Sequence, residues 1–539
     1  MYNDCFFNSI WAIIDFINLE FGGQGVYQLV DYLLWKWKVA GSSPVSLKCE
    51  NFEYVLELIF ILPLIGIFFL LIKPREDIVG LWKIGLEWSL LTLTVTIFLW
   101  ASFDGEGQFQ TIKKFDWIFS IEPVFGVLNF AVDGISIFFI VLTALLTPIC
   151  ILISWNSIKF LVKEFILCLL LMEVLLMGVF TILDLVGFYI LFEGILIPMF
   201  LIIGIWGTRE EKIQASYYFF FYTFVGSVFM LLAIFLLYSH VGTTDYQTLC
   251  SLKIESKLQY FLFLGFFLSL AIKIPKMPFH IWLPQAHVEA PVAGSVILAG
   301  VLLKLGGYGF MRFSWPLLPE ASEYFAPLIL TLSLFAIIYG SLTTCRQVDL
   351  KRIIAYSSVA HMGLVTLGLF SHTIQGLVAA VFLMLAHGLV SSALFIVVTY
   401  LYERHHTRLV KYYRGAVITM PVFGILMLTL ILANASIPLS CNFVGEFFSL
   451  LAAFEYSFVV GGLASLGVVL SAGYSIFLYN RVCFGTPSKY LYFSRDLNRR
   501  EFYALMPLVL LIFLMGIFPF PVIDIIKSSI IYQERYSAF

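Results

Sequence analysis

Charged residues are scarce in this sequence. Asp, Glu, Lys and Arg make up 12% of its 539 residues and hydrophobic residues make up 61%, whereas soluble domains are about 25% charged. The formal net charge of -2 is close to zero, and no block rich in Lys and Arg is interleaved with aromatic residues. The composition excludes a soluble globular enzyme, and nucleic acid is not an expected partner.

Closely spaced cysteines are also lacking. Zinc sites, iron–sulfur clusters and disulfide frameworks need closer spacing than the sequence offers. We therefore expect no metal site and expect the thiols to pack as small apolar side chains. The eight cysteines are scattered, with no Cys-x-x-Cys pair: Cys5, Cys49, Cys150, Cys168, Cys250, Cys345, Cys441 and Cys483.

Nucleotide-binding motifs are missing as well. No Gly-x-Gly-x-x-Gly follows a strand pattern, and no Gly-x-x-x-x-Gly-Lys-Ser/Thr occurs. These loops are the usual cradles for dinucleotides and triphosphates. The chain shows no means of binding NADH, flavin or ATP, so any transport that it performs must be driven by a partner.

What the sequence does contain is a series of long apolar runs. A membrane-spanning helix needs about 20 mostly apolar residues, and this criterion predicts an all-α polytopic membrane protein with about fourteen transmembrane helices. The predicted spans lie near residues 52–72, 84–103, 125–153, 164–183, 184–206, 213–239, 258–283, 290–314, 325–345, 352–371, 375–401, 416–454, 459–484 and 503–526.

Basic residues favour one side of these spans. Lys and Arg concentrate in the loops after odd-numbered spans, as in Lys73 and Arg75 after the first and Arg346 and Lys351 after the ninth. The positive-inside rule then places these loops in the matrix or cytoplasm, with both termini on the opposite side.

Residues 1–50 differ from the rest. Their apolar stretches, 5–19 and 26–37, are short and are interrupted by Asp15 and Asp31. Stretches of that length are typical of interfacial or partner-facing helices. We expect an N-terminal extension over 1–50 and a transmembrane domain over 51–539. Neither a signal peptide nor an Arg-rich presequence is recognisable, so the first spans are expected to direct insertion.

Two spans contain helix breakers at mid-membrane depth. These are the segments 274–278, with Pro275 and Pro278, and 434–438, with Pro438. Proline frees backbone carbonyls, which is tolerated in a membrane where protein or water satisfies them. The breaks fall five spans apart, in the seventh and twelfth. This spacing suggests two inverted five-helix repeats, helices 4–8 (about 164–314) and 9–13 (about 325–484).

Six ionisable residues lie within the apolar runs. A charge at the bilayer centre costs about 2.5–3.5 kcal/mol on insertion scales, so such residues must be paired or hydrated and usually mark a transport path. Desolvation and a movable carboxylate can switch a lysine between charge states, and histidine titrates near neutral pH. The candidates for a proton relay are Glu193, Lys273, Lys304, His361, His387 and Glu446.

Each candidate also has a purely structural alternative. Lys273 precedes the first break and could donate to freed carbonyls, and either histidine could form interhelical hydrogen bonds without passing protons. Several further residues are weaker candidates, for which a loop or helix-end role competes with a relay role. These are Glu173, Asp184, His280, His287 and Glu289.

Four motifs give the sequence a close resemblance to a known family. KIPKMPFHIWLPQAHVEAPVAGSVILAGVLLKLGGYGFMRF, LTTCRQVDLKRIIAYSSVAHMGLV, HGLVSSALF and NFVGEFF resemble the subunit 4 family of the proton-pumping NADH:ubiquinone oxidoreductase, respiratory complex I. The likeness runs from about residue 55 to the C-terminal end. It implies an antiporter-like fold of fourteen helices with two inverted repeats, broken helices seven and twelve, and a central polar axis.

The resemblance also implies roles and partners. It maps the family's helix-five glutamate, two axis lysines, connecting histidines and helix-twelve acid onto the six candidates above. Gln285 departs from the family, which usually has glutamate there, as does the segment 439–441. No cofactor is expected in this chain; NADH, FMN, iron–sulfur clusters and ubiquinone are expected in other subunits. Expected partners are other membrane subunits, including neighbouring antiporter-like subunits, together with lipids, protons and internal water.

We therefore expect a proton-translocating subunit in the mitochondrial inner membrane, with the bacterial plasma membrane as the alternative. Redox chemistry elsewhere would shift the interaction of Glu193 with Lys273 and move protons through the axis to Glu446. One rival is a subunit of a multisubunit sodium/proton antiporter or of a membrane-bound hydrogenase. Another is a scaffold whose buried charges only pair helices.

Overall fold

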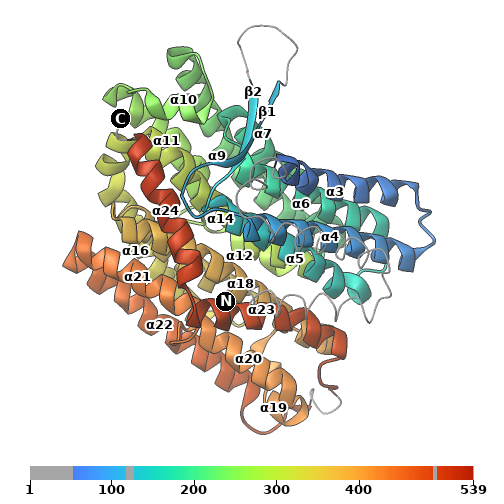
Figure 1. Cartoon of the computed structure of the whole chain (residues 1–539). Helices are drawn as coiled ribbons and strands as arrows, with labels where there is room; N and C mark the ends of the chain where they lie inside the picture. Colours follow the sequence, from blue (N-terminus) through green and yellow to red (C-terminus); the bar gives the residue numbers. More distant parts are fainter. Residues whose placement is uncertain (1–52, 117–126, 490–493, 538–539) are drawn as a thin grey trace, which may run out of the picture.

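The computed structural model describes residues 53–116, 127–489 and 494–537, so the predicted N-terminal extension over 1–50 lies outside the described residues. This part is a bundle of long helices with one short hairpin (Figure 1). In its first half the elements are α3 (Glu53–Ile72), α4 (Ile78–Ala101), β1 (Gln110–Asp116), β2 (Val127–Val132), α5 (Ser136–Ser157), α6 (Val162–Thr181), α7 (Leu185–Gly194), α8 (Leu196–Trp206), α9 (Lys212–Val241), α10 (Tyr246–Ser251), α11 (Ser256–Lys273) and α12 (Trp282–Glu289).

The second half continues the bundle. Its elements are α13 (Val292–Ile297), the π-helical η1 (Leu298–Leu302), α14 (Leu303–Gly309), the π-helical η2 (Phe310–Ser314), α15 (Trp315–Leu317), α16 (Pro319–Arg346), α17 (Leu350–Leu369), α18 (Ile374–His405), the 3-10 helix η3 (Val410–Tyr412), α19 (Ala416–Thr419), α20 (Pro421–Asn434), α21 (Cys441–Tyr456), α22 (Phe458–Cys483), α23 (Arg499–Ile517) and α24 (Phe520–Ser537).

The predicted membrane architecture is confirmed. Thirteen helical segments in the described part are long and apolar enough to cross a membrane; α7 with α8, and α13 through α15, each form one of them. The remaining predicted span, 416–454, is divided between the shorter helices α20 and α21. The two five-helix repeats stay a prediction.

The expected start of the third span was wrong. Residues 127–132 form strand β2, which pairs antiparallel with β1, and helix α5 begins only at Ser136. The Asp133 carboxylate accepts a hydrogen bond from the Ser136 N–H at 2.9 Å and so starts the helix there. A short apolar run fits a strand as well as a helix, and tertiary pairing decides between them.

Short polar side chains fix where other helices begin. Asp184, Asp349 and Thr373 each accept a hydrogen bond from a backbone N–H in the first turn of α7, α17 and α18, respectively. Such a cap satisfies one of the N–H groups that a helix start leaves unpaired. These capping residues therefore fix where the three helices begin.

The break in the seventh span lies where the sequence predicted it. Helix α11 ends at Lys273 and α12 begins at Trp282, with no α-helix over 274–281. Pro275 cannot donate a helical hydrogen bond, so carbonyls of the last turn take other partners. The indole N–H of Trp282 donates to the Ile272 carbonyl at 3.0 Å.

The break in the twelfth span is also present. Helix α20 ends at Asn434, α21 begins at Cys441, and Pro438 lies between them. The Asn434 side-chain amide donates to the Ser475 hydroxyl of α22 at 3.2 Å. A side chain at the end of the half-helix is thus held by the neighbouring span.

The eighth span carries an irregularity that the sequence did not predict. Two π-helical turns, η1 and η2, flank α14, and such turns are frequent at functional sites. Helix α18 comes very close to η1 at Gly388: a Cβ atom there would lie 2.9 Å from the Gly300 carbonyl oxygen and 3.6 Å from Cε of Lys304. Glycine at 388 permits this approach.

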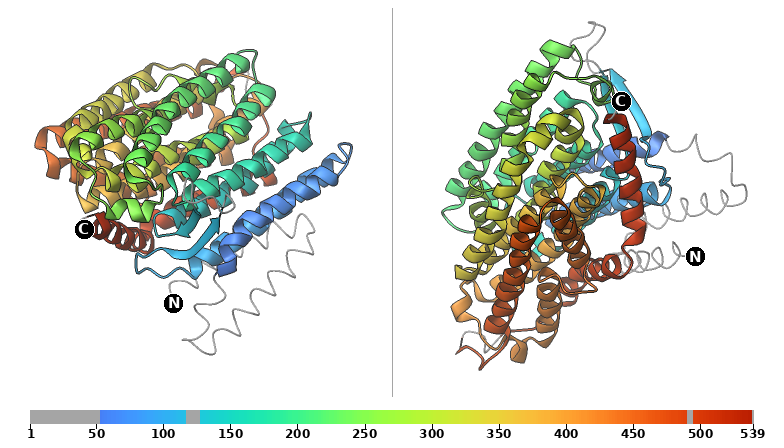
Figure 2. Two further views of the ribbon diagram at one scale, coloured as in Figure 1. Left: turned by 90° about the horizontal axis from the view of Figure 1, so that it is seen from above. Right: turned by 90° about the vertical axis from the view of Figure 1, so that its left-hand side faces the viewer.

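The last helix, α24, was not predicted either. It lies across one end of the bundle near the β1–β2 hairpin, as Figures 1 and 2 show, and packs against α10, α15 and α18. The Gly134 N–H donates to the Ser529 hydroxyl at 3.0 Å. Gly107, with φ of +83°, lies so close to Ser528 that a Cβ would come within 2.4 Å of its carbonyl oxygen. Helix α24 is therefore seated on the segment between the second and third spans.

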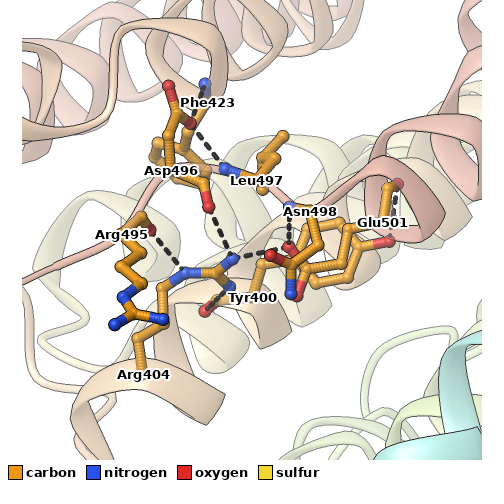
Figure 3. A network of polar contacts seen from close by, with 8 residues as sticks. All are labelled: Tyr400, Arg404, Phe423, Arg495, Asp496, Leu497, Asn498 and Glu501. Atoms are coloured by element: carbon orange, nitrogen blue, oxygen red, sulfur yellow. Dashed lines mark hydrogen bonds and ion pairs between the residues drawn. The ribbon is translucent and has the colours of Figure 1, made fainter.

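A polar network ties α18, α20 and α23 together (Figure 3). The Arg404 guanidinium donates to the Glu501 carboxylate at 2.5 Å and to the Arg495 carbonyl at 2.9 Å. The Asp496 carboxylate accepts from the Phe423 N–H, at the start of α20, at 3.1 Å. The side chains of Arg404 and Glu501 are only 14% and 11% exposed, so each supplies the counter-charge that the other's burial requires.

Replacing Arg404 by Ala is expected to lower the free energy of unfolding by about 2–3 kcal/mol, because it leaves the Glu501 carboxylate largely buried without its cation. The measurement is the midpoint temperature of thermal unfolding of the purified complex. Arg499→Ala is the matched control, since Arg499 is exposed at the start of α23, the helix that carries Glu501. Equal midpoints for the two variants would refute a stabilising role for the network.

Candidate functional site

The six predicted residues come from six helices. Five of them are at least 97% buried, and Glu193 is half-buried. Glu193 lies near the end of α7, Lys273 ends α11, Lys304 is on α14, His361 on α17, His387 on α18 and Glu446 on α21.

Lys273 and Glu193 form a loose pair. Their side chains interact electrostatically, but no ion pair within 4 Å joins them in the described part of the chain. The Lys273 ammonium lies 4.2 Å from the ring centroid of Phe192. Neither Nζ of Lys273 nor Oε1 of Glu193 has a hydrogen-bond partner from the described protein residues. The two groups are therefore close enough to interact electrostatically, and no direct ion pair holds their side chains in one arrangement.

Lys304 and His387 are in direct contact. Nζ of Lys304 lies 2.9 Å from Nδ1 of His387, and it also donates to the Ala299 carbonyl within the first π-helical turn. Lys304 is 0% exposed and His387 is 1% exposed. The close approach at Gly388 brings the two helices near enough for this contact.

His361 and Glu446 form the next contact. Nδ1 of His361 lies 2.8 Å from Oε1 of Glu446, although the ring N–H direction does not suit a well-formed hydrogen bond. The two imidazole rings, His361 and His387, have centroids 5.5 Å apart. A small pocket borders His361 and Glu446, with Gly467 and Ser471 of α22 among its lining residues.

These contacts form a continuous buried path from one lysine to one carboxylate. In space the order is Lys304, His387, His361 and Glu446, which differs from the order along the chain. Helix α11 packs against α14, but no side-chain contact joins Lys273 to Lys304 in the described residues. The structure thus gives one direct path and one separate pair beside it.

The weaker candidates form two groups by position: Glu173 and Asp184 lie on or beside α6 and α7, and the other three lie near the first break. Asp184 has a helix-end role: it accepts from the Gly187 N–H at 2.7 Å and from the Thr244 hydroxyl at 2.6 Å. Glu173 is buried and accepts from the Thr92 hydroxyl at 2.6 Å.

The second group lies after the first break, near the basic loops. His287 is fully buried and stacks on Phe395 at 4.5 Å between ring centroids. Glu289 lies 3.9 Å from the Arg209 guanidinium. His280 is less enclosed. None of the three is in contact with the six predicted residues by hydrogen bond or ion pair within the described chain.

Sequence reasoning missed a buried ion pair. The Arg312 guanidinium lies 2.5 Å from the Asp133 carboxylate, and both are almost fully buried. Arg312 Nε also donates to the Tyr308 hydroxyl at 3.2 Å. The signal was present, since Arg312 lies within the predicted eighth span, 290–314. The buried Lys276 was not among the candidates, because the segment 274–278 that contains it was interpreted only as a helix break.

Cysteines in the described residues are free thiols, and those of α5, α21 and α22 are buried. Within residues 53–116, 127–489 and 494–537, no three His, Cys, Asp or Glu side chains gather as a metal site would require. Cys5 and Cys49 lie outside these residues.

The chain is similar to proteins of one respiratory family. Residues 183–471 match the family described as NADH:quinone oxidoreductase/Mrp antiporter, transmembrane. NADH-ubiquinone oxidoreductase chain 4 of Metridium senile is 70% identical over 480 residues, which cover 89% of this chain and 98% of the relative. That of Chondrus crispus is 52% identical over 461 residues, covering 85% and 93%. A chain of respiratory complex I from Thermus thermophilus shares the fold with a TM-score of 0.80 at 29% identity, covering 90% and 99%.

Proposed function

The chain belongs to the NADH-ubiquinone oxidoreductase chain 4 family, and on that basis we propose that the six buried side chains described above carry its protons. It is a proton-translocating membrane subunit of NADH:ubiquinone oxidoreductase and a multi-pass protein of the mitochondrial inner membrane. What is proposed is the identity of the residues that carry the protons.

The observation that supports the proposal is the series of neighbouring buried side chains from Lys304 to Glu446. The Lys304 ammonium donates a proton to Nδ1 of His387, which faces it at 2.9 Å. His387 releases a proton from its other ring nitrogen toward His361, with internal water bridging the rings. His361 then protonates the Glu446 carboxylate, 2.8 Å from its Nδ1. Histidine suits both middle steps because its ring has two nitrogens, so that one can accept a proton while the other releases one.

Lys273 and Glu193 control the entry to this path. The charged form of a buried lysine is favoured by a nearby carboxylate and disfavoured by desolvation. A small displacement of Glu193 away from Lys273 therefore lets the ammonium lose its proton, through internal water, to the neutral amine of Lys304. The loose geometry of the pair supports this role, since no tight ion pair has to be broken first.

Redox chemistry takes place in other subunits under this proposal. The sequence contains no dinucleotide motif, no phosphate loop and no cysteine cluster, the features that bind NADH, flavin and iron–sulfur clusters. NADH, FMN, the clusters and ubiquinone are assigned to partner subunits. Electron transfer there is what displaces Glu193 here.

The partners of this chain are other membrane subunits of the complex, with lipids covering what they leave free. Large apolar side chains are exposed along α3, α9 and α22, as suits surfaces that face lipid or other spans. The basic loops face the matrix by the positive-inside rule. Nucleic acid has no place in this assembly.

Lys273→Met tests the entry to the relay. Methionine preserves an apolar, flexible side chain of similar length but cannot carry a proton. We expect NADH-driven proton translocation in inner-membrane vesicles to fall about tenfold or more, as when a positioned acid–base group is lost. Acidification of the vesicle interior, normalised to the amount of assembled complex, is the measurement.

Lys257→Met is the matched control, because Lys257 is exposed on the same helix, α11. It should pump at the normal rate. Normal pumping by a fully assembled Lys273→Met complex would instead favour the scaffold, in which buried charges only hold helices together. Sodium-dependent exchange without quinone reduction would favour the antiporter rival.

A further inference from the structure

A second lysine is buried at the break that follows α11. Lys276 lies three residues after Lys273, beyond Pro275, and is 1% exposed. The relay proposed above does not use it. Burying an ammonium group inside a membrane protein costs free energy, so a buried lysine with no structural need usually has a function.

The Lys276 ammonium has no carboxylate partner. Its Nζ lies 3.5 Å from the Ile329 carbonyl oxygen of α16, and 5.7 Å and 5.6 Å from the ring centroids of Phe267 and Phe370. Throughout the described residues no Asp or Glu forms an ion pair with it. The groups that face Nζ from α11, from α16 and from the end of α17 are thus two phenyl rings and one carbonyl, none of which titrates.

This environment differs from that of a permanently charged residue. Arg312, also buried, has the Asp133 carboxylate at 2.5 Å, as a guanidinium that never loses its proton requires. A lysine in an apolar setting can lose its proton, and the neutral amine needs no counter-charge. One carbonyl and two rings stabilise the cation modestly, so both forms of Lys276 can be accommodated.

The position of Lys276 relative to the membrane is also informative. Ile329 lies in the first half of α16, far from the basic end at Arg346, and Phe370 follows the end of α17 that is remote from Lys351. Lys276 therefore reaches from the break toward the end of the bundle opposite to the basic loops.

Polar groups continue in that direction. Ser371 follows Phe370, and its hydroxyl lies 3.2 Å from that of Thr373. Between them is His372, which is exposed and interacts electrostatically with Glu323 of α16. The phenyl ring of Phe370, which faces Lys276, is thus followed in the chain by polar residues, of which His372 is exposed at the surface.

We propose that Lys276 is a further proton-carrying residue on a branch from Lys273: part of the protons that Lys273 releases go to Lys276 instead of the Lys304 path, and Lys276 passes them toward the end of the bundle opposite to the basic loops. In this step the Lys273 ammonium loses one proton through bridging water to the neutral amine of Lys276; Lys273 becomes neutral, Lys276 becomes charged, and no electron moves. The inference rests on the proposed function, since it requires Lys273 to carry a proton.

The test compares three substitutions at one position in the assembled complex. Lys276→Met removes charge and proton, Lys276→Arg keeps the charge but cannot release the proton, and Lys276→His keeps a titratable group. We expect NADH-driven pumping in vesicles to fall with Met and equally with Arg, by a smaller factor than with Lys273→Met because the path through Lys304 remains. Lys276→His should retain pumping, with its pH profile displaced to lower pH because imidazole is the weaker base.

Each outcome decides the matter. Normal pumping with Met, or with Arg, overturns the proposal, the second because a fixed charge then suffices. If Lys276→Met fails to assemble, the Arg and His variants decide on the same terms. Lys273→Met, measured in parallel, separates the two hypotheses: if it is defective while Lys276→Met is normal, only this inference fails; if Lys273→Met is normal, the proposed relay itself fails.

Discussion

Lys304→Met is expected to stop coupled proton pumping almost completely. Lys304 is the start of the direct path: its Nζ contacts His387 at 2.9 Å, and no other side chain of the described protein takes its place. Loss of a positioned proton donor typically slows a step about 100-fold or more. Proton translocation per assembled complex in vesicles is the measurement, with NADH oxidation by a soluble electron acceptor recorded to show that the redox subunits are intact.

A double variant makes the Lys304 test specific. If Lys304 and His387 act as one unit, adding His387→Gln to Lys304→Met should lower pumping no further, because residues in one chain of transfer are not additive. Independent losses for the two single variants that multiply in the double variant would contradict a shared path. Lys253→Met, in an exposed loop, is the control for removing a lysine.

Glu446→Gln should have the second largest effect. Glutamine keeps the shape of the side chain but cannot accept the proton that His361 delivers across 2.8 Å. We expect pumping to fall about tenfold to 100-fold, while the amount of complex in the membrane stays near normal. Pumping rate and complex content, measured on the same vesicles, separate these two effects.

Glu455→Gln is the matched control, being the same substitution at an exposed position of the same helix, α21. It should leave pumping unchanged. If Glu446→Gln pumped as well as Glu455→Gln, the path would have to leave the chain elsewhere, and the contact between His361 and Glu446 would be structural. A shift of the pH optimum in Glu446→Gln would independently mark the carboxylate as a titrating group.

Local signals account for what the sequence predicted well. Pro275 and Pro438 weaken the helix at their own positions, because the missing donor and the ring clash are properties of the residue itself; Pro148 and Pro327 nevertheless lie inside continuous helices. Ionisable residues in apolar runs, such as Lys304 and Glu446, stand out because insertion makes them rare. The spans, the two breaks and the candidate residues therefore follow from short stretches of sequence.

Tertiary packing accounts for what the sequence did not predict. The run 127–132 became a strand because β1 lies beside it. The first π-helical turn lies where α18 approaches closely at Gly388, and one sequence without its neighbours does not reveal this approach. For the same reason the spatial order of the two histidines, with His387 next to Lys304 and His361 next to Glu446, could not be read from their order along the chain.

Helix α24 determines when the subunit can be completed during synthesis. The Gly134 N–H bonds to Ser529, a residue 395 positions later in the chain, so the contact cannot form until Ser529 has been synthesised. The first spans enter the membrane long before that, and the segment around Gly107 must wait for its covering helix. A premature stop before Phe520 would thus release a chain that has the thirteen candidate spans of the described part but lacks the helix that covers Gly107.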